Sequence, residues 1–133
     1  MKLFTLEIVT PSKLAFTAEV VSVTVPGSLG EFQVLYNHAP IVSNLEIGKM
    51  KVQTKDGDTL HFAISGGVIE VLKNKVVVLA QSLERSDEID TERARQAVER
   101  AKQRLGQRDQ IDVARAEAAL TRGMNRLKVS SLR

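Results

Sequence analysis

The hydrophobic periodicity of the chain changes once, close to Leu83. Before this residue, apolar and polar side chains alternate in short runs such as Phe4 to Ile8, with the period of two that is typical of half-buried β-strands. After it, apolar residues recur at three- and four-residue steps over 94–105 and 113–127, which is typical of amphipathic helices. The change of period predicts a β-domain followed by a pair of helices.

Turn residues divide the first part into many short strands. Asp56 to Asp58 and Lys73-Asn74 separate alternating runs that can pair as hairpins, and the remaining runs are interrupted at Pro11, Pro26-Gly27, Gly30 and Pro40. This spacing favours an antiparallel sandwich or barrel. We therefore predict an α+β protein, with an antiparallel β-sandwich over 1–84 and a two-helix antiparallel hairpin over 85–133.

The predicted helices are rich in alanine, and their apolar stripe is narrow. At ~25 cal/mol per Å² of buried apolar area, contacts between alanines contribute little. Gly123 inside the second helix costs roughly 1 kcal/mol relative to alanine. Gly106 can end the first helix and Asp109 can cap the second. Two such helices would dock reversibly, so we predict a C-terminal third that can move.

Composition excludes several classes of function. The chain contains no cysteine, so it has no disulfide, thiolate nucleophile or sulfur-ligated metal. The net charge is +3, and all ten arginines lie at or after Arg85. They are interspersed with acids and no aromatic residue follows Phe62, a pattern that argues against a nucleic-acid partner. We see no signal peptide and no apolar run of about 20 residues, so we expect any membrane association to depend on a partner.

No arrangement of residues indicates catalysis or metal binding. His38 and His61 are the only histidines, and neither has a second ligand at a typical metal spacing. We expect His61 on the outer face of its strand, and His38 to form hydrogen bonds within a loop. Gly66-Gly67 lacks the helix of a phosphate-binding loop and indicates a bulge or a close approach of strands.

Several short motifs, in their order, resemble the epsilon subunit of bacterial F-type ATP synthases. They are VTP at 9–11, LGEFQVLYNHAP at 29–40, ISGGVIEV at 64–71, LAQSLERSDEID at 79–90 and RGMNRL at 122–127. The resemblance spans essentially the whole chain and implies a β-sandwich of about ten strands before the helical hairpin. The chain departs from the usual family pattern at Gln33, Tyr36 and Gly123, and the glycine, where alanine is usual, would loosen the last helix.

The resemblance implies a non-catalytic central-stalk, or rotor, subunit that couples proton flow to ATP synthesis. The sandwich would bind the gamma subunit and the ring of c-subunits, with Glu31, Asn37 and His38 in a rotor-facing loop. The hairpin would fold onto the sandwich, or extend along gamma into the alpha/beta catalytic head and block ATP hydrolysis. The subunit would be peripheral, on the cytoplasmic side of the bacterial inner membrane.

Two interpretations of the arginines do not involve a ligand. In the first, they form a solvated helix face, paired with acids three or four residues away. In the second, they contact the catalytic beta subunit when the hairpin extends, for which the resemblance implies Arg115, Arg122, Arg126 and Lys128. Exposed ion pairs contribute only about 0–1 kcal/mol each, so inhibition would need a cluster.

The third interpretation is a regulatory ATP site. Some members of the family bind ATP in the folded hairpin, and residues 89–94 match their motif in full. The fixed positions of this motif are Ile89, Asp90, Arg93 and Ala94. Accessory positions of the binding members are matched by Glu84, Arg100, Arg122 and Arg126. The resemblance implies that the acidic residues accept hydrogen bonds from the base or ribose and that arginines from both helices clamp the phosphates. Asp90 would also cap its helix.

The alternative function, from a different class, is that of a generic scaffold or nucleic-acid adaptor.

Overall fold

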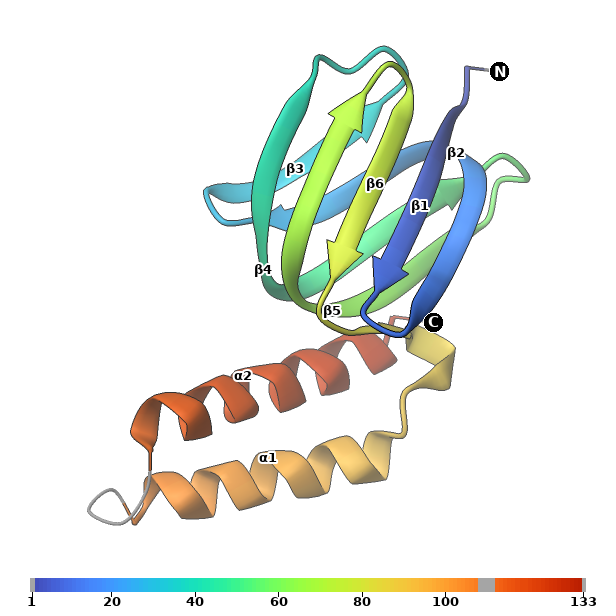
Figure 1. Ribbon diagram of the computed structural model, residues 1–133. Coiled ribbons are helices and arrows are strands. Elements are labelled where there is room, and N and C mark those ends of the chain that lie inside the picture. The colour runs from blue at the N-terminus through green and yellow to red at the C-terminus, as the bar shows by residue number, and fades with distance from the viewer. Residues whose placement is uncertain (1, 108–111, 133) are drawn as a thin grey trace.

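The computed structural model describes residues 2–107 and 112–132, and consists of a β-sandwich with a helical hairpin below it (Figure 1). The strands are β1 (Phe4–Thr10), β2 (Lys13–Gly27), β3 (Gly30–Leu35), β4 (Ile41–Thr54), β5 (Thr59–Leu72), β6 (Lys75–Ala80) and β7 (Leu83–Arg85). A 3₁₀ turn, η1 (Ser86–Glu88), leads to the helices α1 (Thr91–Leu105) and α2 (Val113–Ser130). The predicted α+β architecture is confirmed.

The sheet closes on itself. Its strands follow the order β1-β6-β5-β4-β2-β3, β7 pairs with β5, and β1 pairs in addition with β2. All pairs are antiparallel except β1 with β6. The structure has seven strands instead of the predicted ten or so, because β4 and β5 contain 14 residues each and curve from one layer into the other (Figure 1).

The alternation of side chains places one apolar set between the two layers. The largest fully buried side chains are aliphatic or Met, and they come from β1, β2, β3, β4, β5 and β6: Leu6, Ile8, Val20, Val23, Val25, Val34, Met50, Val52, Ile64, Ile69, Val76 and Val78. Phe16 and Phe62 meet edge to face at this core, with their ring centroids 5.6 Å apart. Burial of this continuous set is the main stabilising term of the sandwich.

His61 lies on the outer face of β5, as predicted, opposite Lys51 of β4. Its Nδ1 atom is buried, and in the described part of the chain no group forms a hydrogen bond with it. Burial lowers the pKa of His61, and the nearby charges of Lys51 and Lys49 lower it further. Both effects favour the uncharged form of the imidazole.

The caps of both helices follow from local sequence. The Asp90 carboxylate accepts a hydrogen bond of 3.0 Å from the backbone N–H of Arg93, and Asp112 does the same at the start of α2. Asp109, the predicted cap of the second helix, lies outside the described residues, and α2 begins after Asp112. Gly106 ends α1, as predicted. None of the described helices is long and apolar enough to span a membrane.

Gly123 has a packing role that the sequence did not reveal. It is buried where α2 crosses α1, and a Cβ added to it would lie 2.8 Å from Cγ2 of Val98 and 3.7 Å from the carbonyl oxygen of Ala94. The missing side chain lets the helices approach closely. This contact offsets the helix-propensity cost of glycine, so Gly123 does more than loosen the helix.

Gly67 provides a sharp test of the sheet geometry. Its φ of +150° is accompanied by a φ of +98° at Gly66, and a Cβ at Gly67 would collide with the backbone carbonyl of Leu79. We expect Gly67→Ala to lower the free energy of unfolding by about 3 kcal/mol or more. The control is Gly57→Ala, where φ is +89° but the space is open, and we expect a loss of about 1 kcal/mol. Urea unfolding measures both, and equal losses would contradict the assigned contact.

Candidate functional site

The hairpin docks on the sandwich through its second helix. Helix α2 lies between α1 and the sandwich (Figure 1) and contacts β4, β5 and η1. Helix α1 packs on α2, and among the described residues it makes no comparably extensive contact with any strand. The position of the whole hairpin therefore depends on what α2 touches.

Three contacts hold α2 in place. The side-chain amide of Asn125 donates a hydrogen bond of 2.8 Å to the carbonyl oxygen of Gly48 in β4. Val129 packs with Ile89 and Ala63 in a small buried cluster, separate from the sandwich core. The third contact is an ion pair between Arg126 and Glu84.

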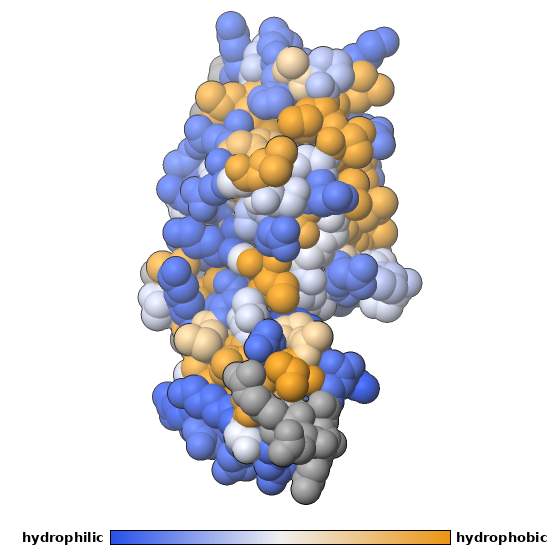
Figure 2. Space-filling view, turned by 90° about the vertical axis from the view of Figure 1, so that its left-hand side faces the viewer, coloured by the Kyte–Doolittle hydropathy of each residue, from blue (hydrophilic) through white to orange (hydrophobic). Residues whose placement is uncertain are grey.

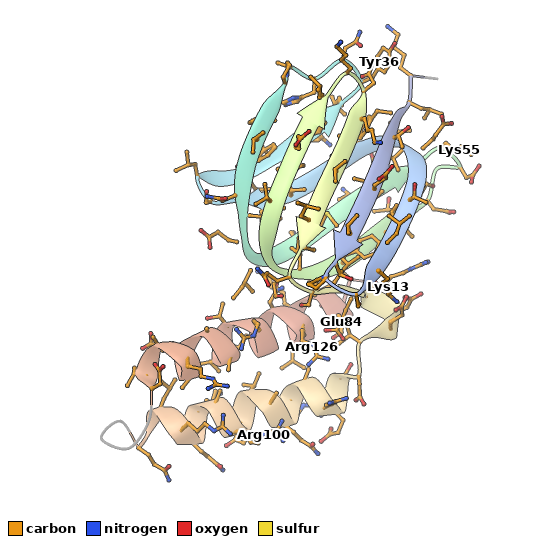
Figure 3. All side chains as sticks on the ribbon, in the orientation of Figure 1. Lys13, Tyr36, Lys55, Glu84, Arg100 and Arg126 are labelled. Carbon is orange, nitrogen blue, oxygen red and sulfur yellow. The ribbon has the colours of Figure 1, made fainter. Side chains whose placement is uncertain are left out.

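The ion pair joins α2 to the last strand of the sheet. Arg126 donates from Nε to Oε1 of Glu84 at 2.5 Å and from Nη2 to Oε2 at 3.0 Å (Figure 3). This forked geometry is the strongest form of an arginine–carboxylate contact. The two side chains are 24% and 34% exposed, so solvent screening reduces the net contribution to about 1 kcal/mol.

A pocket of about 300 Å³ lies beside this ion pair, with walls from both domains. The hairpin contributes Ala97 from α1 and Ala119, Arg122 and Asn125 from α2. The sandwich contributes Ile47, Ser65 and Ser82, and Glu84 and Arg126 also line the pocket. It is the kind of cavity, partly apolar with convergent polar groups, that binds small ligands.

The structure separates the residues of the predicted ATP site into four groups, of which Arg93 and Arg100 are described in the next paragraph. Glu84, Arg122 and Arg126 line the pocket. Ile89 and Ala94 are 4% and 0% exposed and are buried in contacts within the protein. Asp90 caps α1, as described above.

The two arginines predicted on α1 flank the pocket. Arg93 and Arg100 are exposed, and they lie four residues before and three residues after Ala97, which lines the pocket. In a helix these spacings place side chains on one face. Figure 3 labels Arg100 on α1, below Arg126 on α2. Within the described part of the chain, no salt bridge involves Arg93, Arg100 or Arg122.

The other predicted roles of the charged residues are only partly visible in this conformation. Of the solvated arginines, Arg95 is paired with Glu92 three residues earlier, at 2.9 Å. Of the residues predicted to contact the beta subunit, Arg115, Arg122 and Lys128 are exposed, whereas Arg126 is engaged by Glu84. Arg115 and Arg126 are about 16 Å apart along the helix. Arg115, Arg122 and Arg126 share one face of α2, whereas Lys128, two residues after Arg126, lies on another face.

Glu31, Asn37 and His38 do not share one loop. Residues 30–35 form β3, and a strand of six residues spans about 17–20 Å, so Glu31 lies at the opposite end from Asn37. Asn37 pairs with Asn74 through hydrogen bonds of 2.7 and 2.9 Å. The His38 ring donates from Nδ1 to the carbonyl oxygen of Ala39 at 2.6 Å, in agreement with the predicted loop hydrogen bond.

Two family models together match nearly the whole chain. The model of the ATP synthase delta/epsilon chain β-sandwich domain matches residues 3–86, and that of its long α-helix domain matches residues 87–131. The chain belongs to the ATP synthase delta/epsilon chain family. The predicted family is thereby confirmed.

Relatives and solved structures of the delta/epsilon family agree with this assignment. The ATP synthase epsilon chain of Desulforamulus reducens is 47% identical over 100 residues, 75% of each chain. That of Nitratidesulfovibrio vulgaris is 51% identical over 100 residues, 75% of this chain and 74% of the relative. A chain of the Euglena gracilis mitochondrial ATP synthase has the same fold, with a TM-score of 0.72 at 23% identity over 98% of this chain and 79% of that chain.

The delta/epsilon chain also contains pocket residues that sequence reasoning missed. Ser65, Ser82 and Ile47 come from the sandwich, and Asn125 from α2. Ser65 and Ser82 stand inside motifs that carried the family resemblance, but their meeting depends on the pairing of β7 with β5. Among the described residues, no three or more His, Asp or Glu side chains lie so that together they could hold a metal ion.

Loss of the Glu84–Arg126 ion pair should loosen the hairpin of this delta/epsilon chain. We expect Glu84→Gln and Arg126→Gln each to raise the detached population several-fold, and a double-mutant cycle to give a coupling of about 1 kcal/mol. Because the chain has no cysteine, distance probes can be attached uniquely at Ser28→Cys and Glu117→Cys. The matched control is Glu92→Gln with Arg95→Gln on the exposed face of α1, which should leave the distance distribution unchanged. A zero coupling at 84 and 126 would show that the pair does not hold the hairpin.

Proposed function

We propose that the chain is a non-catalytic central-stalk subunit of a proton-translocating F-type ATP synthase. The relatives that it matches are named ATP synthase epsilon chain, and a chain of similar fold, with a TM-score of 0.59, belongs to the central stalk and c-ring of the Tetrahymena thermophila mitochondrial ATP synthase. The subunit would rotate with the stalk and help to couple proton flow to ATP synthesis. It would be peripheral to the bacterial inner membrane, on the cytoplasmic side, through its partners.

An apolar face of the sandwich supports binding to the gamma subunit. Val42, Leu72 and Leu79 are 70%, 47% and 53% exposed, and they lie on the adjacent strands β4, β5 and β6 with their side chains outside the core. The front layer of the sandwich in Figure 1 lies on the right in Figure 2, because the view is turned by 90°. Figure 2 shows apolar side chains along this right-hand margin. Grouped exposed aliphatic residues mark protein interfaces. The end of the sandwich with Asn37 and His38 would face the c-ring.

The docked hairpin would be one of two states. Its three contacts with the sandwich are small, so detachment costs little compared with unfolding of the sandwich core. In the extended state, Arg115, Arg122 and Arg126 on one face of α2, and Lys128 near its end, would meet acidic surfaces of the alpha/beta head and block ATP hydrolysis. Extension would also release Arg126 from Glu84 for this contact.

ATP would regulate the balance between the states by binding the docked hairpin. The observation that carries this proposal is the convergence of Glu84, Arg122 and Arg126 on one pocket at the junction of the domains. Arginines bind phosphates through forked, charge-assisted hydrogen bonds. A ligand shifts an equilibrium only by its preference for one state, and this pocket exists only when α2 is docked.

Removal of one phosphate-binding arginine tests this function. Hydrogen bonds to charged groups contribute about 1.5–3 kcal/mol, so we expect Arg122→Ala to weaken ATP binding to the isolated chain at least about tenfold. The control Arg95→Ala removes an arginine that is paired with Glu92 away from the pocket, and should leave the affinity unchanged. Isothermal titration calorimetry measures both. No heat with the wild-type chain at millimolar ATP would refute ATP binding.

A further inference from the structure

We infer that strand β3 is a self-complementary edge, through which two copies of the free chain pair around a two-fold axis at Gln33. The starting observation is that β3 lies at one end of the strand order and pairs with β2. Among the described residues, β3 makes no comparably extensive contact with any other element. Its second edge is therefore open to another strand, and the turn before it projects from the side of the sandwich (Figure 1).

This edge lacks the features that usually prevent such pairing. Proteins protect edge strands by keeping them short, or by placing lysine, proline or a bulge in them. Strand β7, which also pairs with one neighbour among the described strands, has three residues. Strand β3 has six residues, contains no lysine or proline, and keeps an unbroken register with β2. Its one charged residue, Glu31, stands next to the turn.

The hairpin with β2 determines which backbone groups of β3 face outward. Gly27 and Gly30 flank a loop of two residues, and residues that flank such a loop form a hydrogen-bonded pair. Hydrogen-bonded and non-hydrogen-bonded pairs alternate along an antiparallel ladder. Pro26, which has no N–H, falls in the next pair with Glu31, as this alternation requires. The backbone groups that point away from β2 are therefore those of Glu31, Gln33 and Leu35.

These three residues pair completely in one register. In an antiparallel arrangement, Gln33 lies opposite Gln33 of the second copy, and Glu31 lies opposite Leu35 of the second copy. Every other symmetrical register leaves one of the three without a strand residue opposite it. In the complete register, each residue exchanges N–H and C=O hydrogen bonds with its partner. No two like charges lie opposite each other, which would oppose pairing.

The side chains of the edge favour the same arrangement. Phe32 packs against the sandwich core but is partly exposed. In the paired form it lies opposite Val34 of the second copy, at a non-hydrogen-bonded position where side chains approach most closely. Tyr36, directly after the strand and 39% exposed, lies opposite Gly30 of the second copy, and aromatic residues stabilise glycines of edge strands in this way. Pairing therefore covers apolar surface that the single chain exposes.

Sedimentation velocity of the full chain at rising concentration tests the inference. The association is weak, because an interface of one strand from each copy falls below the roughly 1,000 Å² typical of stable complexes. We expect a reversible monomer–dimer equilibrium, with the dimer increasing as the concentration approaches about a millimolar. Gln33→Pro removes the outward N–H at the axis and is compatible with an edge strand. We expect this variant to associate at least about fivefold more weakly.

A charge exchange at the same position tests the register. Gln33→Lys and Gln33→Glu each place like charges opposite each other, so at low salt each variant alone should associate about two- to fivefold more weakly. An equimolar mixture of the two should regain association, because opposite charges then face each other across the axis. Asn44→Lys, at an exposed position of the inner strand β4, is the matched control and should associate like wild type.

Three outcomes would overturn the inference. The first is a wild-type chain that stays monomeric at every concentration, and the second is wild-type association of the Gln33→Pro chain. The third is a mixture of the lysine and glutamate variants that associates no better than either alone. Urea unfolding of all variants should match wild type, because Gln33 is exposed and its N–H faces solvent. A large loss of stability in Gln33→Pro would show that this N–H bonds to β2, which would also contradict the assigned edge.

Discussion

The contact of α2 with the sandwich is the interaction on which the arrangement of the molecule depends. The position of α1 depends on that of α2, because α1 packs on α2 and makes no comparably extensive contact with any described strand. The pocket also exists only because Ala119, Arg122 and Asn125 are held opposite Ile47 and the two serines. A small number of side chains therefore determines whether the hairpin stays docked and whether this pocket exists.

The two domains differ in how they are stabilised, and this difference suits a switch. The sandwich buries a continuous aliphatic core drawn from six strands. The hairpin is joined to it by a partly exposed ion pair, one side-chain hydrogen bond to the backbone and a cluster of three small or medium apolar side chains. Each of these contributes on the order of 1 kcal/mol. A ligand with millimolar to micromolar affinity can therefore shift the balance between docked and detached hairpins.

The sequence predicted the features that depend on local pattern. Alternation and helical spacing gave the order of the two domains, and the carboxylate of Asp90 caps α1 as its position before Thr91 indicated. The motifs also identified the family, which the comparisons confirm. The count of about ten strands came from the resemblance, and the structure has seven because long strands such as β4 and β5 continue from one layer into the other.

Features that depend on docking could not be predicted. Glu84 and Arg126 are separated by 42 residues, and nothing in the pattern of charges indicates that they meet in the docked hairpin. Helix propensity alone predicts that Gly123 destabilises α2. In the structure its missing side chain makes room for Val98 and lets the two helices pack closely. Ile89 and Ala94 match a ligand-binding motif in the amino-acid sequence, but in the folded protein both side chains are buried in contacts with other residues of the chain.

The rate of ATP hydrolysis by the assembled ATP synthase tests the central claim, that a hairpin able to leave the sandwich regulates the enzyme. The comparison is between complexes with the full chain and with a chain that ends at Ser86. We expect the truncated complex to hydrolyse ATP faster at low ATP concentration, and the difference to narrow as ATP rises and holds the hairpin docked. Equal rates at every ATP concentration would contradict this account.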